Sequence, residues 1–250
     1  MGFVPPIVAL NIAHSDMQHL PENLMLADAD FDWVHFDVAD GNYVPRLTFG
    51  APVLAFARRF SQATFDAHLM CARPARLVGP LCAAGANLVT IHPDTTDQPR
   101  ELLRAIRNEG VRAGIALCPK THFESVRRLL PEVDLVSVLT SGMEYDSLEF
   151  QSELLARVRS ARELRARERL TFLIKVEGGL TLQTVAAARE AGADVYVVGG
   201  AVFASSDPAY TLATFRAAVR GETLSGSQDG VTSAQAPKRT TQIFRRRRAA

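Results

Sequence analysis

Short apolar runs alternate with longer amphipathic stretches along most of this chain. Runs rich in Val, Ile and Leu are typical of strands in a parallel sheet that is covered on both faces. The predicted strands are 7–11, 33–37, 64–68, 88–92, 113–117, 135–139, 172–176 and 195–198. The stretches between them predict helices, with the clearest at 74–84, 98–108, 124–130, 149–167, 182–191 and 208–219.

This alternation predicts an α/β protein with a closed (β/α)8 barrel, the TIM-barrel fold. Gly85, Gly110 and Gly192 each follow a predicted helix and precede a predicted strand, where a helix terminus favours glycine. The length of 250 residues suits one such barrel, which we expect to occupy 1–221 as a single domain. A doubly wound open sheet is the alternative architecture.

The composition changes at residue 222. The segment 222–250 is rich in Ser, Thr, Gln, Gly and Ala, which predicts a disordered tail. It carries six basic and two acidic residues, so its net charge is +4, whereas the barrel has 22 basic and 25 acidic residues and a net charge of −3. The arginine run 245–248 could bind RNA or another anionic surface, and a solvated tail without a specific role is the simpler interpretation.

Composition also narrows the class of protein. No apolar run reaches the roughly 18 residues that a transmembrane helix needs, and the N-terminus lacks the pattern of a signal peptide. The three cysteines, Cys71, Cys82 and Cys118, lack metal-type spacing and are typical of reduced thiols in the cytoplasm. We therefore expect a cytoplasmic protein with no membrane partner, and no nucleic-acid partner for the barrel.

Candidate chemistry lies where the predicted strands end, because functional residues of a barrel stand at the C-terminal ends of its strands. His35, His68 and His92 lie at three successive strand ends. Asp37 is two positions after His35, so both side chains point to the same side of the strand. Two imidazoles and a carboxylate at one place make a plausible site for a divalent metal.

Glu177 ends the seventh strand, from which its carboxylate could face Asp37 across the barrel. Two opposed carboxylates near a metal suit proton transfer at a carbon next to a carbonyl. Lys175 has the same parity as Glu177 and could form a Schiff base with a carbonyl substrate. The preferred interpretation places Lys175 one layer deeper, paired with a carboxylate.

Two glycine pairs, 178–179 and 199–200, follow the last two predicted strands, and the second leads into a short helix. Glycines at these ends can present backbone N–H groups to a phosphate. The pattern therefore predicts an anion site beside the candidate metal site.

These segments resemble the ribulose-phosphate 3-epimerase family, which includes allulose-6-phosphate 3-epimerases, over about residues 7–221. The most specific segment, 35–45, reads HFDVADGNYVP and is similar to the family's H-x-D-x-M-D-G-x-F-V-P. The segment 66–70, DAHLM, is similar to D-x-H-L-M. Other matching segments in the same order are GAN at 85–87, IHP at 91–93, VEGG at 176–179, AGAD at 191–194 and GGAVF at 199–203.

The resemblance implies a metal-dependent epimerase that inverts C3 of a ketose phosphate of the ribulose 5-phosphate type. It implies one divalent ion, with Zn, Fe(II), Co and Mn all suited to the donor set, and a homo-oligomer is common in the family. The implied metal ligands are His35, Asp37, His68 and Glu177, with Asp37 and Glu177 as the acid/base pair. The implied substrate contacts are Asn11, Met70, His92, Gly178, Gly179, Gly199 and Gly200, the glycines holding the phosphate.

Several positions depart from the family pattern. Glu177 stands where the family has Asp, Asn11 where it has Ser, Ala39 where it has Met, and Arg46 where it has Asn. The segment 142–148, GMEYDSL, replaces a glycine-rich loop, and its two carboxylates would repel a phosphate. These departures keep two alternatives open. One is a related barrel with a changed substrate or chemistry, such as an epimerase of a non-phosphorylated ketose, an aldolase or a decarboxylase; the other is a catalytically weak binding or regulatory homologue.

Overall fold

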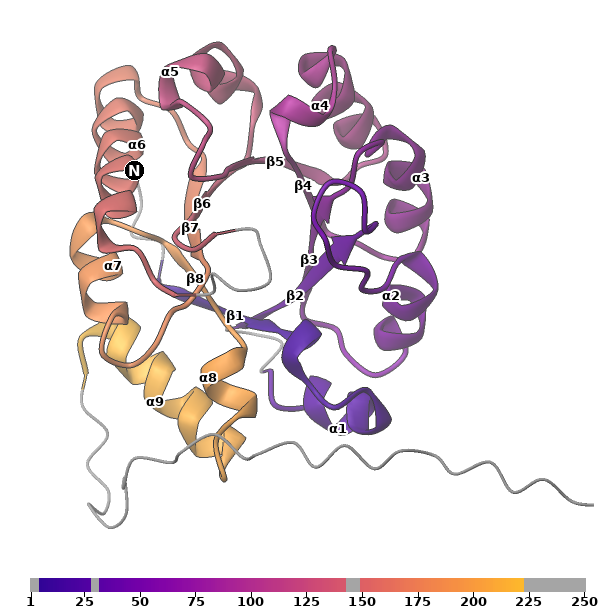
Figure 1. The fold of residues 1–250 in the computed structure, drawn as a ribbon, viewed down its shortest axis with the longest axis vertical. Coiled ribbons are helices and arrows are strands. Elements are labelled where there is room, and N and C mark those ends of the chain that lie inside the picture. Colours follow the sequence, from indigo (N-terminus) through magenta and orange to yellow (C-terminus); the bar gives the residue numbers. More distant parts are fainter. Residues whose placement is uncertain (1–4, 28–31, 143–148, 223–250) are drawn as a thin grey trace, which may run out of the picture.

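Parallel strands close into a barrel in chain order, each strand pairing with the next and the last with the first (Figure 1). The computed structural model describes residues 5–27, 32–142 and 149–222. The strands are β1 (Ile7–Asn11), β2 (Asp32–Ala39), β3 (Thr64–Met70), β4 (Leu88–Ile91), β5 (Arg112–Leu117), β6 (Leu135–Leu139), β7 (Leu173–Glu177) and β8 (Val195–Val198). The predicted α/β barrel is therefore confirmed.

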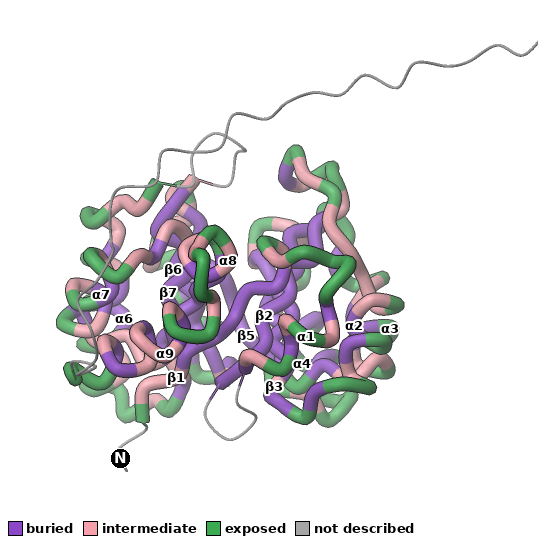
Figure 2. The backbone as a smooth tube through the Cα atoms, turned by 90° about the horizontal axis from the view of Figure 1, so that it is seen from below, coloured by how far each residue is buried: buried purple, intermediate pink, exposed green. Residues whose placement is uncertain are grey.

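Helices form a ring outside the strands (Figure 1). They are α1 (Leu20–Leu24), α2 (Ala51–Arg58), α3 (Ala75–Ala83), α4 (Pro99–Asn108), α5 (Phe123–Val126), α6 (Leu155–Glu168), α7 (Val185–Ala191), α8 (Gly200–Phe203) and α9 (Pro208–Arg220). Figure 2 shows the strands as the buried centre, with the exposed positions on the surrounding helices and loops. Within the described ranges, no helix is long and apolar enough to cross a membrane.

Alternation along each strand sorts the side chains into two environments. Val34, Phe36 and Val38 of β2 face the helices and join the large outer core. Trp33 faces inward and packs with Leu88 and other residues from the strand starts, which fills the floor of the barrel. His35 and Asp37 share the inward parity of Trp33, so they stand above that floor.

Two predicted helices have different bounds in the structure. The prediction of one helix over 124–130 is wrong, because α5 ends at Val126 and a 3-10 helix (Arg127–Glu132) follows. Pro131 lies in that 3-10 helix and has no N–H to donate to the carbonyl of Arg127, the bond that an α-helix would need.

The helix predicted over 149–167 begins later, at Leu155. The backbone N–H of Gln151 donates to the carbonyl of Thr140 at 2.7 Å, which ties this segment to the end of β6. The helix predicted over 182–191 likewise begins at Val185, after a turn in which the Thr184 hydroxyl accepts from the N–H of Thr181. Residues 143–148 of the acidic segment and 223–250 of the predicted tail lie outside the described residues.

Candidate active site

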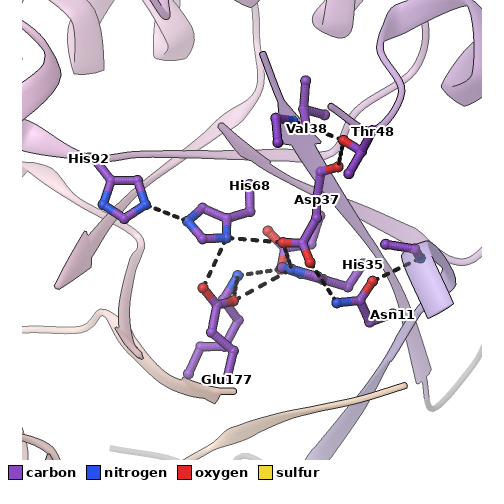
Figure 3. A network of polar contacts seen from close by, with 12 residues as sticks. Asn11, His35, Asp37, Val38, Thr48, His68, His92 and Glu177 are labelled. Carbon is purple, nitrogen blue, oxygen red and sulfur yellow. Dashed lines mark hydrogen bonds and ion pairs between the residues drawn. The ribbon is translucent and has the colours of Figure 1, made fainter. Parts of the chain in front are cut away.

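The inward-facing residues above the barrel floor form two polar layers. Strand pairing puts His35 beside Asp66 in the lower layer, and Asp37 beside His68 in the upper one. On the other side of the barrel, Glu177 ends β7 at the level of the upper layer. Figure 3 shows the side chains of His35, Asp37, His68 and Glu177 pointing toward one another.

Two histidines and two carboxylates, His35 of the lower layer and Asp37, His68 and Glu177 of the upper one, meet inside the barrel. His35 Nε2 lies 3.2 Å from Asp37 Oδ1 and 3.5 Å from Glu177 Oε2. His68 Nδ1 lies 3.3 Å from Asp37 Oδ1 and 2.9 Å from Glu177 Oε1. The structure thus brings together the four residues that the sequence analysis singled out as metal ligands, from three strands.

This cluster fits a divalent cation. One ligand atom each from His35, His68 and Glu177 lie within 4.8 Å of one another, and all three residues are buried. Among the described residues, neither carboxylate oxygen of Glu177 has a well-aligned hydrogen-bond donor, although the Lys175 ammonium lies 3.2 Å from Oε2 as an ion pair. A buried carboxylate facing two imidazole nitrogens without such a donor has the surroundings expected of a ligand, and nitrogen and oxygen donors in this mixture suit zinc and its first-row neighbours.

The electrostatics of the cluster also favour positive charge at its centre. Burial and Lys175 lower the pKa of His35, but Asp66 and Asp37 outweigh them and raise it to about 9. Burial likewise lowers the pKa of His68, while Glu177 and Asp37 raise it above its ordinary value. Burial raises the pKa of both Asp37 and Glu177, yet the histidines, together with Lys175 beside Glu177, hold it below the ordinary range. Protons or a cation can supply the charge that these carboxylates require.

Asn11 fixes the orientation of Asp37. Its Nδ2 donates to Asp37 Oδ2 at 2.8 Å, and its own Oδ1 accepts from the N–H of Ala13 at 2.9 Å (Figure 3). The first bond leaves Asp37 Oδ1 to face the histidines. Asn11 is buried at the cavity wall. The substrate contact that the sequence analysis expects of Asn11 would therefore be a second role, beside its hydrogen bond to Asp37.

His92 lies behind His68. The Nε2 atoms of the two rings are 2.8 Å apart and the rings stack with centroids 4.9 Å apart. His92 is fully buried and is absent from the residues that line the described cavity. Its position favours an orienting contact on His68 over the direct substrate contact expected from the sequence.

Lys175 lies one layer below Glu177, as the preferred interpretation of the sequence expected. Its ammonium is fully buried and lies 2.6 Å from Asp66 Oδ2. Asp66 Oδ2 also accepts from His35 Nδ1 at 2.8 Å. A lysine engaged in this way lies outside the residues that line the described cavity and does not present a free amine to a carbonyl substrate.

A cavity of about 530 Å³ opens above the cluster. Met70 and both glycine pairs line it, as expected, and so does His14. Gly178 has φ +104°, and a Cβ there would come within 2.3 Å of the Ser141 hydroxyl, so the position requires glycine. A Cβ at Gly199 would lie 2.7 Å from the carbonyl oxygen of Asn11, so β1 and β8 also approach closely at the cavity wall.

The sequence analysis did not identify some residues of the site. Thr48 accepts from the N–H of Ala39 at 2.9 Å and donates to the carbonyl of Asp37, which secures the end of β2. Thr140 donates to the carbonyl of Gly178 at 2.7 Å and so ties β6 to the loop after β7. Thr181 and Thr184 line the cavity beside the first glycine pair. A polar side chain near a strand end could have pointed to these threonines. Threonine is so common in turns, however, that its presence there does not indicate a functional site.

Comparisons with a family model and with individual proteins point to the same family. Residues 7–203 match the ribulose-phosphate 3 epimerase family. Ribulose-phosphate 3-epimerase of Mycobacterium tuberculosis is 36% identical over 211 residues, which cover 84% of this chain and 92% of that protein. The Treponema pallidum enzyme of the same name is 37% identical over 200 residues, covering 80% and 92%. The cytoplasmic isoform from Oryza sativa is 36% identical over 194 residues, covering 76% and 83%.

Among solved structures, KGPDC from Streptococcus mutans superposes with a TM-score of 0.66 at 15% identity, covering 88% of this chain and 99% of that chain. At this identity, the similarity supports the barrel fold alone.

Proposed function

This chain belongs to the ribulose-phosphate 3-epimerase family, and we propose that it inverts the configuration at C3 of a ketose phosphate of the ribulose 5-phosphate type. The observation that carries the proposal is the meeting of Asp37 and Glu177, from β2 and β7, at the same pair of histidines. Epimerisation needs one group to remove a proton from one face of a carbon and another to return a proton to the opposite face.

Asp37 and Glu177 fill these two roles. One enters the reaction as a carboxylate and accepts the C3 proton. The other takes up a proton against its lowered pKa, enters as a carboxylic acid and donates that proton to the other face. Their protonation states are then exchanged, and the reverse reaction restores them. Asn11 donates to Asp37 Oδ2 and so fixes the orientation of the carboxylate that exchanges the proton.

His35, Asp37, His68 and Glu177 would hold one divalent cation, for which Zn, Fe(II), Co and Mn are the candidates. When bound, the cation supplies positive charge for the negative charge that develops on the substrate oxygens. The buried histidines contribute neutral nitrogen donors, and His92 behind His68 orients that ring.

The glycine pairs 178–179 and 199–200 would hold the phosphate through backbone N–H groups, with Met70 against the carbon chain.

We assign the enzyme to the cytoplasm, in keeping with the name of the Oryza sativa relative. We also propose a homo-oligomeric state, which size measurement in solution can test. The predicted division into a barrel over 1–221 and a separate tail over 222–250 belongs to the same proposal.

A second candidate, epimerisation of a non-phosphorylated ketose, is favoured by one observation. Glu149 lines the cavity together with both glycine pairs. Its carboxylate would repel a phosphate dianion, while Arg46, which also lines the cavity, would attract it.

Steady-state kinetics with D-ribulose 5-phosphate and D-ribulose separate the two candidates. The first predicts a kcat/KM at least about a hundredfold higher for the phosphate ester, since several backbone donors and an arginine act on the dianion. Activity should disappear with chelator and return with one of the four metals. Equal or greater kcat/KM for D-ribulose would overturn the first candidate in favour of the second.

A further inference from the structure

Lys175 is a buried cation next to the proposed metal site that the epimerisation mechanism leaves without a role. It lies on β7 two residues before Glu177, so both side chains point into the barrel. It is fully buried and lies outside the residues that line the described cavity. It therefore does not touch a substrate in that cavity, and any effect on the reaction must pass through its neighbours.

Lys175 contacts a proposed metal ligand directly. Its Nζ lies 3.2 Å from Glu177 Oε2. The other oxygen, Oε1, lies 2.9 Å from His68 Nδ1. The ammonium is thus ion-paired with the oxygen that faces His35, while the other oxygen faces His68.

Lys175 reaches a second ligand through Asp66. Asp66 Oδ2 accepts from Lys175 Nζ at 2.6 Å and from His35 Nδ1 at 2.8 Å. A carboxylate can only accept, so the neutral ring of His35 carries its proton on Nδ1, and its Nε2 faces Asp37 and Glu177. Such partners of a ligating histidine fix the ring and its tautomer.

A purely structural role would have Lys175 do no more than neutralise Asp66. Burying an ammonium is costly. An apolar pair of similar volume in place of Asp66 and Lys175 would avoid burying either charge. The bridge to Glu177 distinguishes the two roles, because neutralising Asp66 does not require contact with a metal ligand.

We propose that Lys175 is a positioning residue of the metal centre, which holds the Glu177 carboxylate and the Asp66–His35 pair in the arrangement that receives a divalent cation. This inference rests on the proposed function only in so far as that function places a cation at these residues.

The test compares Co²⁺ binding by two variants that differ only at residue 175, Asp66→Asn and Asp66→Asn/Lys175→Met. The asparagine introduced at position 66 keeps an oxygen that can accept from His35 Nδ1. It also removes the buried negative charge that Lys175→Met alone would leave without its ammonium. Affinity is measured by calorimetry, ligand geometry by the visible absorption of Co²⁺, and folding by circular dichroism.

The double variant is expected to bind Co²⁺ about 10- to 100-fold more weakly than Asp66→Asn and to show a changed Co²⁺ spectrum. Its kcat should fall while KM stays within about threefold, since the lost contacts lie outside the cavity. Equal affinity and equal spectra for the two variants would overturn the proposal and leave Lys175 as a neutralising partner of Asp66.

The wild-type protein separates failure of this inference from failure of the proposed function. Wild type that binds Co²⁺ but converts no ketose phosphate would contradict the proposed reaction and leave the Lys175 comparison intact. Wild type that binds no Co²⁺ would overturn the metal site and this inference together.

Discussion

At the scale of single residues, parity along each strand decides which side chains can act. His35, Asp37 and Glu177 share the inward parity of Trp33 and Lys175, and this much could be predicted from the sequence. The sequence alone could not determine which oxygen of Asp37 faces the histidines, because that depends on Asn11, 26 positions away in the chain. Contacts of this kind arise from strand pairing and have no local signature.

Substitution of Asp37 by asparagine should lower kcat by about 10²- to 10⁴-fold, because a proton acceptor and a ligand are lost together. The new amide oxygen can still accept the hydrogen bond from Asn11, so the fold should be retained. Steady-state kinetics measure the effect, with circular dichroism as the control for folding. Turnover within tenfold of wild type would contradict the role given to Asp37.

Glu177→Asp shortens the second carboxylate by one methylene and should preserve or raise turnover of D-ribulose 5-phosphate. The reason is that the family pattern has aspartate at this position, so the site would approach that pattern. The measurement is kcat/KM of the variant against wild type. A loss of more than tenfold would mean that the pocket and Lys175 are arranged for the longer side chain.

Protonation of the metal-free cluster makes the stability of the folded protein depend on pH. The pKa of His35 is raised to about 9 in the folded protein from an ordinary value of 6.5. Its stabilising effect is therefore complete below pH 6.5 and is lost as the pH rises through 9.

Thermal melts of chelator-treated protein should accordingly show a falling Tm between pH 6.5 and pH 9. Saturating divalent metal should abolish the fall, because the cation replaces the protons. A Tm of the metal-free protein that stays level or rises over this range would contradict the assigned direction.

At the scale of elements, the apolar runs in the sequence predicted every strand of the barrel. The predicted bounds of the helices were less accurate than those of the strands. β1, β6 and β8 have the bounds that the sequence predicts. The starts of α6 and α7 differ because hydrogen bonds to strand ends and within turns hold the preceding residues. Those bonds also shape the loops around the cavity, so the errors in prediction fall near the site.

Gly178→Ala tests whether the loop after β7 is as tightly constrained as the structure indicates. A Cβ at this position would lie 2.3 Å from Ser141 Oγ and 2.9 Å from its backbone nitrogen. We expect destabilisation by about 1–3 kcal/mol and a marked loss of kcat/KM.

Gly110→Ala is the matched control. Gly110 also has a positive φ (+76°), but a Cβ there would meet no described atom within 4 Å, and the residue lies away from the cavity. The substitution should cost stability through backbone strain alone and leave kcat/KM unchanged. Denaturant unfolding and steady-state kinetics measure both variants. Equal effects of the two substitutions on kcat/KM would contradict a special constraint at Gly178.

At the scale of the whole molecule, the alternation of strands and helices was sufficient to predict the barrel, and the family match is consistent with it. A closed barrel brings β2, β3 and β7 to one axis, which is why residues far apart in the chain, such as Asp37 and Glu177, reach the same histidines. Arg46 and Glu149 both line the cavity, with opposite charges, and the strand pattern does not predict which of them acts on a substrate.

The central claim is that this barrel moves the C3 proton of a ketose phosphate between two carboxylates. Proton NMR of the metal-loaded protein with D-ribulose 5-phosphate in D₂O tests it most directly, since it follows deuterium incorporation at C3 and formation of the 3-epimer together. We predict both signals, and their loss on chelation. Absence of C3 exchange with metal demonstrably bound would contradict the claim.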